Sequence, residues 1–183
     1  MTATINASTS SGVVVTSDTS GSLALQSNGT TQAIIGTNGF QAVGTNTNDN
    51  ASTGYIGEYV SSTVASNGVS MTSGTVINIT SISLTAGDWD VSGVVGITNT
   101  LGTTTYTYIN YGSSSTSATI GNLGQGGSLT TNSNIAATVD FIAPIPTTRF
   151  SLASTTTIYL IARASFATSN SYAYGVIRAR RAR

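Results

Sequence analysis

The sequence almost lacks the residues from which helices are built. Lys does not occur, Glu occurs once and Met twice, and these straight-chain residues are among the best helix formers. Ile, Val and Thr instead make up about a third of the chain, and their branched side chains suit the pleated surface of a sheet. No window of about a dozen residues shows an apolar period of 3.6 residues. The sequence therefore predicts an all-β protein.

The apolar content is small for a chain of 183 residues. Leu, Ile, Val and Phe together form a little over one fifth of it, only 7% of the residues are charged, and the net charge is zero. Disordered chains combine few apolar residues with high net charge, and this chain lacks the second property. We expect a folded protein whose core is barely sufficient in a single copy, which favours oligomerisation.

The chain divides into two parts that differ in the length of their apolar runs. Residues 1–43 contain short apolar pieces separated by turn signals, among them Asn28-Gly29 and Asn38-Gly39. This segment is too short to hold a core alone, and three copies wrapped around one another would bury it. Residues 44–54, "GTNTNDNASTG", contain no apolar residue larger than alanine and are predicted to be a polar linker.

Residues 55–183 carry longer apolar runs and are predicted to form a separate head domain. Seven to nine strands with turns about every ten residues indicate an antiparallel β-sandwich of the jelly-roll type. Residues 113–134 are expected to be an exposed loop, and the strand after them should end at its two prolines.

Alternation assigns faces to two of these strands. After the Ala86-Gly87 turn, one face receives the apolar residues, and Asp88, Asp90 and Ser92 lie on the other. The apolar face comprises Trp89, Val91, Gly93, Val95 and Ile97. In "TTTYTYINYG", residues 103–112, Tyr106 and Tyr108 are expected on one side and Thr107, Ile109 and Tyr111 on the other.

Three stretches of the sequence resemble segments of known proteins. "TSISLTAGDWDVSGVVGIT" and the closing "YAYGVIRARRAR" resemble the C-terminal domains of phage fibre and appendage proteins. "TINASTSSGVVVTSDTSGSLALQSNGTTQAII" is similar to the Ser/Thr/Gly-rich β segments of tail fibres and other virion structural proteins. The resemblance implies a homotrimer, a virion-anchoring N-terminal segment and an outward-facing β-sandwich. Tail fibres are usually much longer, so a short head fibre, a decoration protein and a collar protein stay open beside a tail fibre.

The charges are strongly segregated along the chain. All six arginines follow residue 148, and all six acids precede it. Four terminal arginines without an aromatic platform offer only weak, salt-sensitive attraction to phosphates, so nucleic-acid binding is not expected. We predict instead strand-end or inter-subunit ion pairs. Their candidate members are Arg163, Arg178, Arg180, Arg181, Arg183, Asp88 and Asp90.

Asp88 and Asp90 are the best candidates for site chemistry among the acids. Two strand residues that point the same way lie roughly 7 Å apart, which permits calcium binding or a glycosidase acid and base. An arginine-paired outer face, with Trp89 turned inward, is the favoured interpretation.

Composition argues against catalysis. The chain has no His, Lys or Cys, so serine has no side-chain base and zinc has no nitrogen or sulfur ligand. We expect no enzymatic activity, no metal and no cofactor. No signal peptide is visible, and no apolar run approaches the roughly 18 residues of a membrane span, so no membrane insertion is expected.

The tyrosines are the remaining functional candidates. An aromatic ring with a polar tip suits both sugar stacking and protein interfaces. The candidates for surface or glycan contacts are Tyr106, Tyr108, Tyr111, Tyr172 and Tyr174.

These observations favour a non-enzymatic phage virion protein, a short trimeric fibre or decoration protein located on the particle. Residues 1–45 would contact other virion proteins of the capsid, collar or tail, and the head would face the host surface, whose glycans are candidate ligands. A carbohydrate-binding adhesin module is the alternative. A polysaccharide-degrading spike, with Asp88, Asp90 or Asp140 as the acid, is a third hypothesis.

Overall fold

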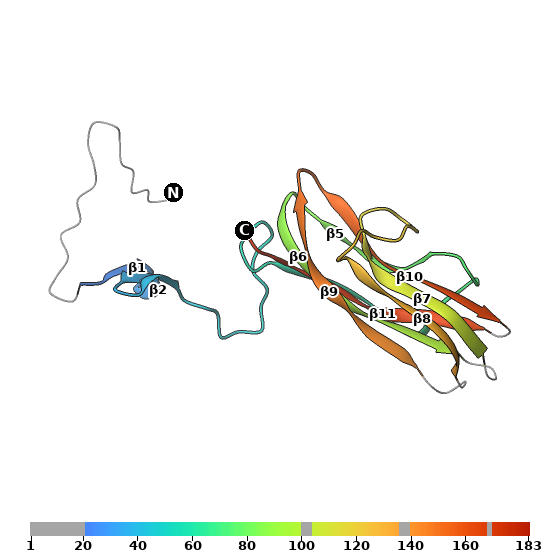
Figure 1. Ribbon diagram of the computed structural model, residues 1–183. Helices are drawn as coiled ribbons and strands as arrows, with labels where there is room; N and C mark the ends of the chain where they lie inside the picture. Colours follow the sequence, from blue (N-terminus) through green and yellow to red (C-terminus); the bar gives the residue numbers. More distant parts are fainter. Residues whose placement is uncertain (1–20, 100–103, 136–139, 168–169) are drawn as a thin grey trace. The chain divides into compact units, whose positions relative to one another are not determined.

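The computed structural model describes residues 21–99, 104–135, 140–167 and 170–183, and these residues form eleven strands and no helix (Figure 1). The chain separates into two compact units, Met1–Asp49 and Asn50–Arg183. The prediction of an all-β protein is confirmed. Within the described ranges, no helix is long and apolar enough to cross a membrane.

The first unit contains a three-stranded antiparallel sheet. It consists of β1 (Leu23–Ser27), β2 (Thr30–Gly36) and β3 (Gly39–Ala42), in the order β1-β2-β3. Asn28 and Gly29 both have positive φ, 51° and 75°, as a two-residue hairpin turn requires. The Asn-Gly signal therefore marks the turn between β1 and β2.

The second unit is a sandwich of two four-stranded sheets. Its strands are β4 (Tyr59–Ser70), β5 (Ile77–Leu84), β6 (Gly87–Asn99), β7 (Thr104–Ser114), β8 (Gly126–Ile135), β9 (Phe141–Leu152), β10 (Thr156–Ala167) and β11 (Ser171–Arg181). The sheet orders are β4-β11-β6-β9 and β5-β10-β7-β8, and every neighbouring pair is antiparallel.

The pairing follows one rule along the second unit. The first strand pairs with the last, the second with the seventh, the third with the sixth and the fourth with the fifth. Such a chain is one long antiparallel hairpin wrapped into two sheets, which is the jelly-roll arrangement. The predicted jelly-roll sandwich is confirmed.

The core lies between the two sheets. Its largest fully buried side chains include Trp89, Leu84, Ile97, Ile109, Leu160 and Ile177. On β6 the predicted alternation holds, because Trp89, Val91 and Val95 have no exposed surface, whereas Asp90 is exposed. The β-branched residues Ile and Val supply much of this core, as is usual for packed sheet faces.

The prediction that Tyr106 and Tyr108 share one face of β7 is wrong, because a β-bulge lies between them. The ladders of β7 with β8 and with β10 both shift register between Tyr106 and Tyr108. Thr107 is the extra residue, so Tyr106 shares the inner face with Ile109, and Tyr108 lies on the opposite face. A bulge of this kind reverses the alternation that follows it.

The predicted loop 113–134 is also too long. Residues 126–135 form the edge strand β8, and the connection between β7 and β8 covers only residues 115–125. The prolines of β9 do not end that strand as predicted. Pro144 pairs opposite Val94, and Pro146 lies where the β6–β9 register shifts. Because β9 is an edge strand, it tolerates residues that cannot donate to a ladder.

The second unit begins inside the segment predicted to be a linker. The side chain of Asn50 donates to the carbonyl of Tyr59 at 2.7 Å and accepts from its N–H at 2.9 Å. Gly57 N–H donates to the carbonyl of Arg181 at 3.0 Å. Residues from Asn50 onward are therefore tied to the sandwich by hydrogen bonds.

Candidate functional site

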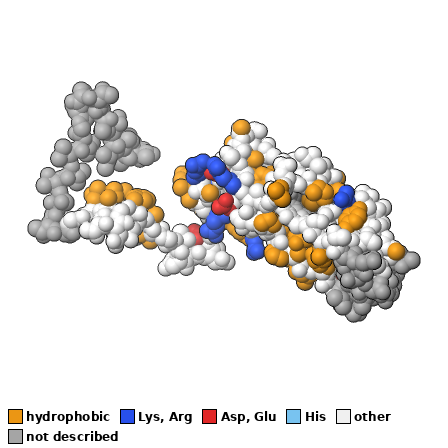
Figure 2. Space-filling model, viewed as in Figure 1, with side chains coloured by type: hydrophobic (Ala, Val, Ile, Leu, Met, Phe, Trp, Pro, Cys, Tyr) orange, Lys and Arg blue, Asp and Glu red, His pale blue; other side chains and the backbone are white. Residues whose placement is uncertain are grey.

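Arginines and acids gather at the end of the sandwich where the chain finishes (Figures 1 and 2). Arg181 is buried, with 5% of its side chain exposed. Its Nε donates to Glu58 Oε2 at 2.9 Å, its Nη1 donates to the carbonyl of Ala86 at 2.9 Å, and its Nη2 donates to Thr85 Oγ1. The guanidinium also stacks 4.3 Å from the ring centre of Trp89. All of these contacts fix the last strand to the core.

Glu58 is the buried partner that the sequence did not suggest. Burial by itself raises the pKa of this carboxyl, but hydrogen bonds from Gly54 N–H and Arg181, together with the arginine charge, bring the pKa below its usual value. The carboxylate therefore stays ionised inside the sandwich end. Glu58 lies 123 residues before Arg181, so no local spacing links the two.

Asp88 forms a second ion-pair cluster beside the first. Its Oδ1 accepts from Arg149 Nε at 2.7 Å and its Oδ2 pairs with Arg183 Nε at 2.8 Å. The hydrogen bond from Arg149 is the main reason that the pKa of Asp88 lies below its usual value. Because both oxygens of Asp88 are held by guanidinium groups, this residue is an ion-pair partner of the arginines rather than one member of a calcium-binding or acid–base pair with Asp90.

The remaining charged candidates divide into two groups. Arg178, Arg180 and Asp90 are exposed on the outer face of the sheet that contains β6 and β11. Arg163 lies on β10, where Nε and Nη2 both donate to Asn110 Oδ1, at 3.2 and 2.9 Å, and the guanidinium lies 4.9 Å from the ring centre of Tyr108. Within the described residues, no cluster of three or more His, Cys, Asp or Glu could hold a metal ion.

The five candidate tyrosines do not form one surface. Tyr106 is 1% exposed and shares a hydrogen bond of 2.6 Å with Ser171 Oγ, and burial raises its pKa. It is a core residue and is not available to a surface ligand. The ring of Tyr111 packs edge-on against Phe141 with centroids 5.6 Å apart, so its ring also belongs to the interior.

The other tyrosines are half-buried on outer faces. Tyr108 lies under Arg163, and Tyr172 and Tyr174 share one face of β11. Tyr174 donates to Asp140 Oδ2 at 2.6 Å. Burial, followed by the hydrogen bond and charge of Asp140, raises the pKa of Tyr174 to about 12.

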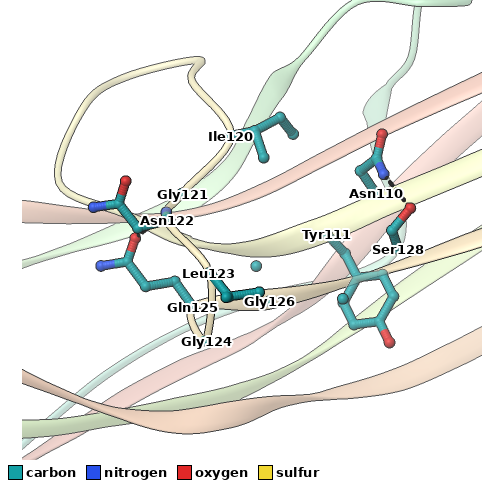
Figure 3. Close-up of a pocket in the computed structure, with 12 residues that line it drawn as sticks. Asn110, Tyr111, Ile120, Gly121, Asn122, Leu123, Gly124, Gln125, Gly126 and Ser128 are labelled. Carbon is teal, nitrogen blue, oxygen red and sulfur yellow. Dashed lines mark hydrogen bonds between the residues drawn. The ribbon is translucent and has the colours of Figure 1, made fainter.

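A pocket of about 280 Å³ lies between the 115–125 loop and strands β7 and β8 (Figure 3). No charged residue lines it. The lining consists of Asn110, Tyr111, Gly112, Ile120, Gly121, Asn122, Leu123, Gly124, Gln125, Gly126, Gly127 and Ser128. Asn110 and Ser128 project from the same side of the paired strands and are joined by a hydrogen bond of 2.6 Å, whereas the ring of Tyr111 projects from the other side (Figure 3).

The loop over this pocket is held by several hydrogen bonds. Gln125 N–H donates to the carbonyl of Asn122 at 3.0 Å, and Gln125 Oε1 accepts from Asn122 N–H at 2.6 Å. Gly124, at the third position of this turn, has a φ of 90°, which glycine adopts without strain. Thr148 Oγ1 of β9 donates to the Gly124 carbonyl at 2.8 Å. The turn therefore presents Leu123, which is fully exposed, on a fixed backbone.

This pocket could not be recognised in the sequence. Its only signal is the glycine-rich run "GNLGQGG", residues 121–127, which was predicted to be part of an exposed loop. Glycine is required where β7 and β8 begin to pair, because a Cβ on Gly112 would lie 2.6 Å from the carbonyl oxygen of Gln125. The spacing of glycines marks the close approach but does not reveal the cavity beside it.

Comparison with known proteins gives only distant similarity. No protein-family model matches the chain, and no curated protein matches it. The crystal structure of the T13 viral particle of infectious bursal disease virus matches with a TM-score of 0.42 and 14% identity, over 67% of this chain and 30% of that chain. The VP2 subviral particle of the same virus matches with a TM-score of 0.41 and 13% identity, over 67% of this chain and 32% of that chain. The structure of the Gx strain matches with a TM-score of 0.37 and 12% identity, over 68% of this chain and 30% of that chain.

This chain therefore spans about a third of the length of the viral chains that it resembles. Similarity at this level assigns no function, and the jelly-roll description follows from the strand pairing in this chain.

Proposed function

We propose that this protein is a non-enzymatic structural component of a virus particle, a short trimeric fibre or decoration protein of a bacteriophage. Residues 1–45 attach it to other virion proteins, and the jelly roll forms an outward-facing head that contacts the host surface or decorates the particle. The observation that carries the proposal is the open apolar face of the small N-terminal sheet, in a chain whose other unit has its own core.

That face is defined by the strand register. Leu23 of β1 pairs with Ile35 of β2, which pairs with Phe40 of β3, so the three side chains share one side of the sheet. They are 38%, 45% and 66% exposed. Leu25 adjoins them on β1 and is 39% exposed. Figure 2 shows apolar side chains gathered on one face of this sheet.

A second copy of the same segment suits this face better than water. Residues 21–48 contain no charged side chain, so copies meet without charge repulsion or desolvation of ions. A three-stranded sheet needs a packed apolar face for stability, and this one has few large side chains of its own. Three copies around an axis would give each sheet the partner it lacks.

The head has the character of an exposed particle component. Jelly rolls are common in viral capsid and lectin domains, although one fold hosts many functions. Ser and Thr, which make up about a third of the chain, provide a neutral polar surface. The ion pairs around Asp88 and Arg181 tie down the strand ends and present no assembled catalytic group.

Imaging of purified particles tests the proposal. Cryo-electron microscopy of particles from the source virus should show short threefold projections that an antibody against the sandwich labels. A matched sample from a virus that lacks the gene should lose both the projections and the label. Particles with full infectivity, no label and no projection would contradict the proposal.

A carbohydrate-binding adhesin module is the second candidate, and the uncharged pocket beside β7 and β8 is the observation that favours it. A glycan array with the purified protein separates a receptor-binding head from a pure decoration protein, which should bind nothing. The degrading-spike hypothesis gains no support from Asp88, which is held by two arginines, or from Asp140, which accepts a hydrogen bond from Tyr174. Its third candidate acid, Asp90, is exposed on the outer face of β6.

A further inference from the structure

We propose that the pocket formed by the 115–125 loop, β7 and β8 binds one ring of a neutral saccharide. This inference rests on the proposed function, since it supplies the chemistry by which the outward-facing head contacts a glycan-covered surface. The residues that would contact the sugar are Ser128, Asn122, Gln125 and Leu123. They differ from the five tyrosines that the sequence suggested as glycan contacts.

The lining matches a ligand that carries hydroxyl groups and no charge. Its polar side chains include the amides of Asn110, Asn122 and Gln125 and the hydroxyl of Ser128, and it contains no carboxylate or guanidinium. Sugar hydroxyls both donate and accept hydrogen bonds, as amides and serine do. A charged ligand would lose hydration in this pocket and find no opposite charge.

The polar groups of the wall are oriented before any ligand arrives. Arg163 donates twice to Asn110 Oδ1, which fixes the amide so that its nitrogen donates to Ser128 Oγ at 2.6 Å. The Ser128 oxygen thus accepts from the Asn110 amide, and its own O–H is directed elsewhere. Similarly, Gln125 Oε1 is engaged by Asn122 N–H, which leaves Gln125 Nε2 as the donor end of that amide. Such pre-orientation lowers the entropy lost on binding.

The apolar part of the lining lies at the loop. Leu123 is fully exposed and Ile120 is 40% exposed, and both belong to the segment that covers the strands (Figure 3). An aliphatic side chain at a pocket rim suits the C–H face of a sugar ring. A volume of about 280 Å³ is near the lower end of small-molecule pockets, about 300 Å³, so one ring fits and an extended chain would continue outside.

A binding experiment on the full-length protein tests the inference. The probes are glucose, galactose, mannose, N-acetylglucosamine and N-acetylgalactosamine, with N-acetylneuraminic acid as the charged comparison. Saturation-transfer NMR detects binding, and sedimentation of the same sample reports the oligomeric state. The variants are Ser128→Ala and Leu123→Asp. Ile56→Asp is the matched control, because Ile56 is an apolar residue of the same unit, 72% exposed, that does not line the pocket.

We expect at least one neutral sugar to bind, and each pocket variant to weaken its binding about threefold to tenfold, the loss typical of one contact. Ile56→Asp should bind as the wild type does. Absence of binding by every neutral sugar, a preference for N-acetylneuraminic acid, or unchanged binding in both pocket variants would overturn the inference.

The two measurements separate this inference from the proposed function. Trimers that bind no sugar would refute the pocket assignment alone. Sugar binding by a monomer, weakened by Ser128→Ala, would support the pocket and refute the trimeric fibre. A Leu123→Asp effect on attachment to a host protein, without any sugar binding, would identify the loop as a protein-docking surface and overturn the saccharide assignment.

Discussion

Single residues at the sandwich end show how a nearly uncharged chain uses its few ions. The sequence predicted Arg181 as a member of a strand-end or inter-subunit ion pair. In the structure Arg181 shares the inner face of β11 with Ile177 and Ala179, and all three are buried. The identity of its partner could not be predicted, because Glu58 becomes adjacent only when β4 and β11, the first and last strands of the sandwich, pair.

Removal of the Arg181 side chain should strongly reduce the free energy of unfolding. Arg181→Ala leaves the Glu58 carboxylate buried without its cation and removes the stacking on Trp89. Breaking such a buried pair from one side costs about 3 to 5 kcal/mol. The matched control, Arg180→Ala on the exposed face, should change the free energy of unfolding by less than about 0.5 kcal/mol. Urea unfolding followed by the fluorescence of Trp89, the only tryptophan, measures both, and equal losses would contradict the assigned role.

The pH dependence of stability follows from the same ion pairs. The folded pKa values of Glu58 and Asp88 lie below their ordinary values of 4.5 and 3.8. The stabilisation that these carboxylates give the folded state is therefore present at pH above those values, and it is lost as the pH falls through the folded pKa. The pKa of Tyr174 is raised from 10.0 to about 12, so its contribution is present below pH 10 and is lost as pH rises toward 12.

Between these limits the urea midpoint should stay constant, because the chain has neither His nor Cys to titrate there. Urea midpoints from pH 3 to pH 11 test this. In Glu58→Gln the fall of the urea midpoint at acid pH should be smaller than in the wild type. In Tyr174→Phe the fall of the urea midpoint at alkaline pH should be smaller. A midpoint that changes substantially between pH 6 and pH 8 would contradict the assignment.

At the level of strands, the sequence predicted the elements that alternate strongly and missed those that do not. β6 was predicted correctly because its large apolar residues recur at every second position. β8 was missed because its residues, "GGSLTTNSNI", include only two large apolar side chains, as suits an edge strand. The bulge at Thr107 left no mark in the composition of β7, since Thr and Tyr suit either face of a strand.

The contact between β6 and β11 depends on glycine. Gly175 has a φ of 149°, and a Cβ there would lie 2.1 Å from the carbonyl oxygen of Val94. Gly175→Ala should therefore force the two central strands apart and reduce the free energy of unfolding by about 2 kcal/mol or more. Gly44→Ala is the control, because nothing lies within 4 Å of its Cβ position and its φ is not in the positive range. Thermal unfolding compares the two, and an unaffected Gly175→Ala protein would show that the strands tolerate the extra atom.

For the whole molecule, the decisive property is that its two units differ in how completely they bury their apolar side chains. The second unit buries Trp89, Leu84 and Ile177 completely, whereas Ala33 is the only apolar residue of the first unit that is buried among the residues described. The sequence predicted this difference, because residues 1–43 contain only short apolar pieces and are too short to hold a core alone. It could not predict which side chains share the open face, because that depends on the register of β1, β2 and β3.

If the open face holds the proposed trimer together, its disruption should dissociate the trimer without unfolding the head. Phe40→Asp places a charge on that face at a position that is 66% exposed in one copy, so a single chain tolerates it, whereas an interface would have to bury the carboxylate. Gln41→Asp is the matched control, since Gln41 is the next residue of β3 and points to the opposite side of the sheet. In sedimentation velocity, the wild type and Gln41→Asp should run as trimers and Phe40→Asp as a monomer, all with the same Trp89 unfolding transition. A monomeric wild type, or a Phe40→Asp trimer as stable as the wild type, would show that this face does not hold the copies together.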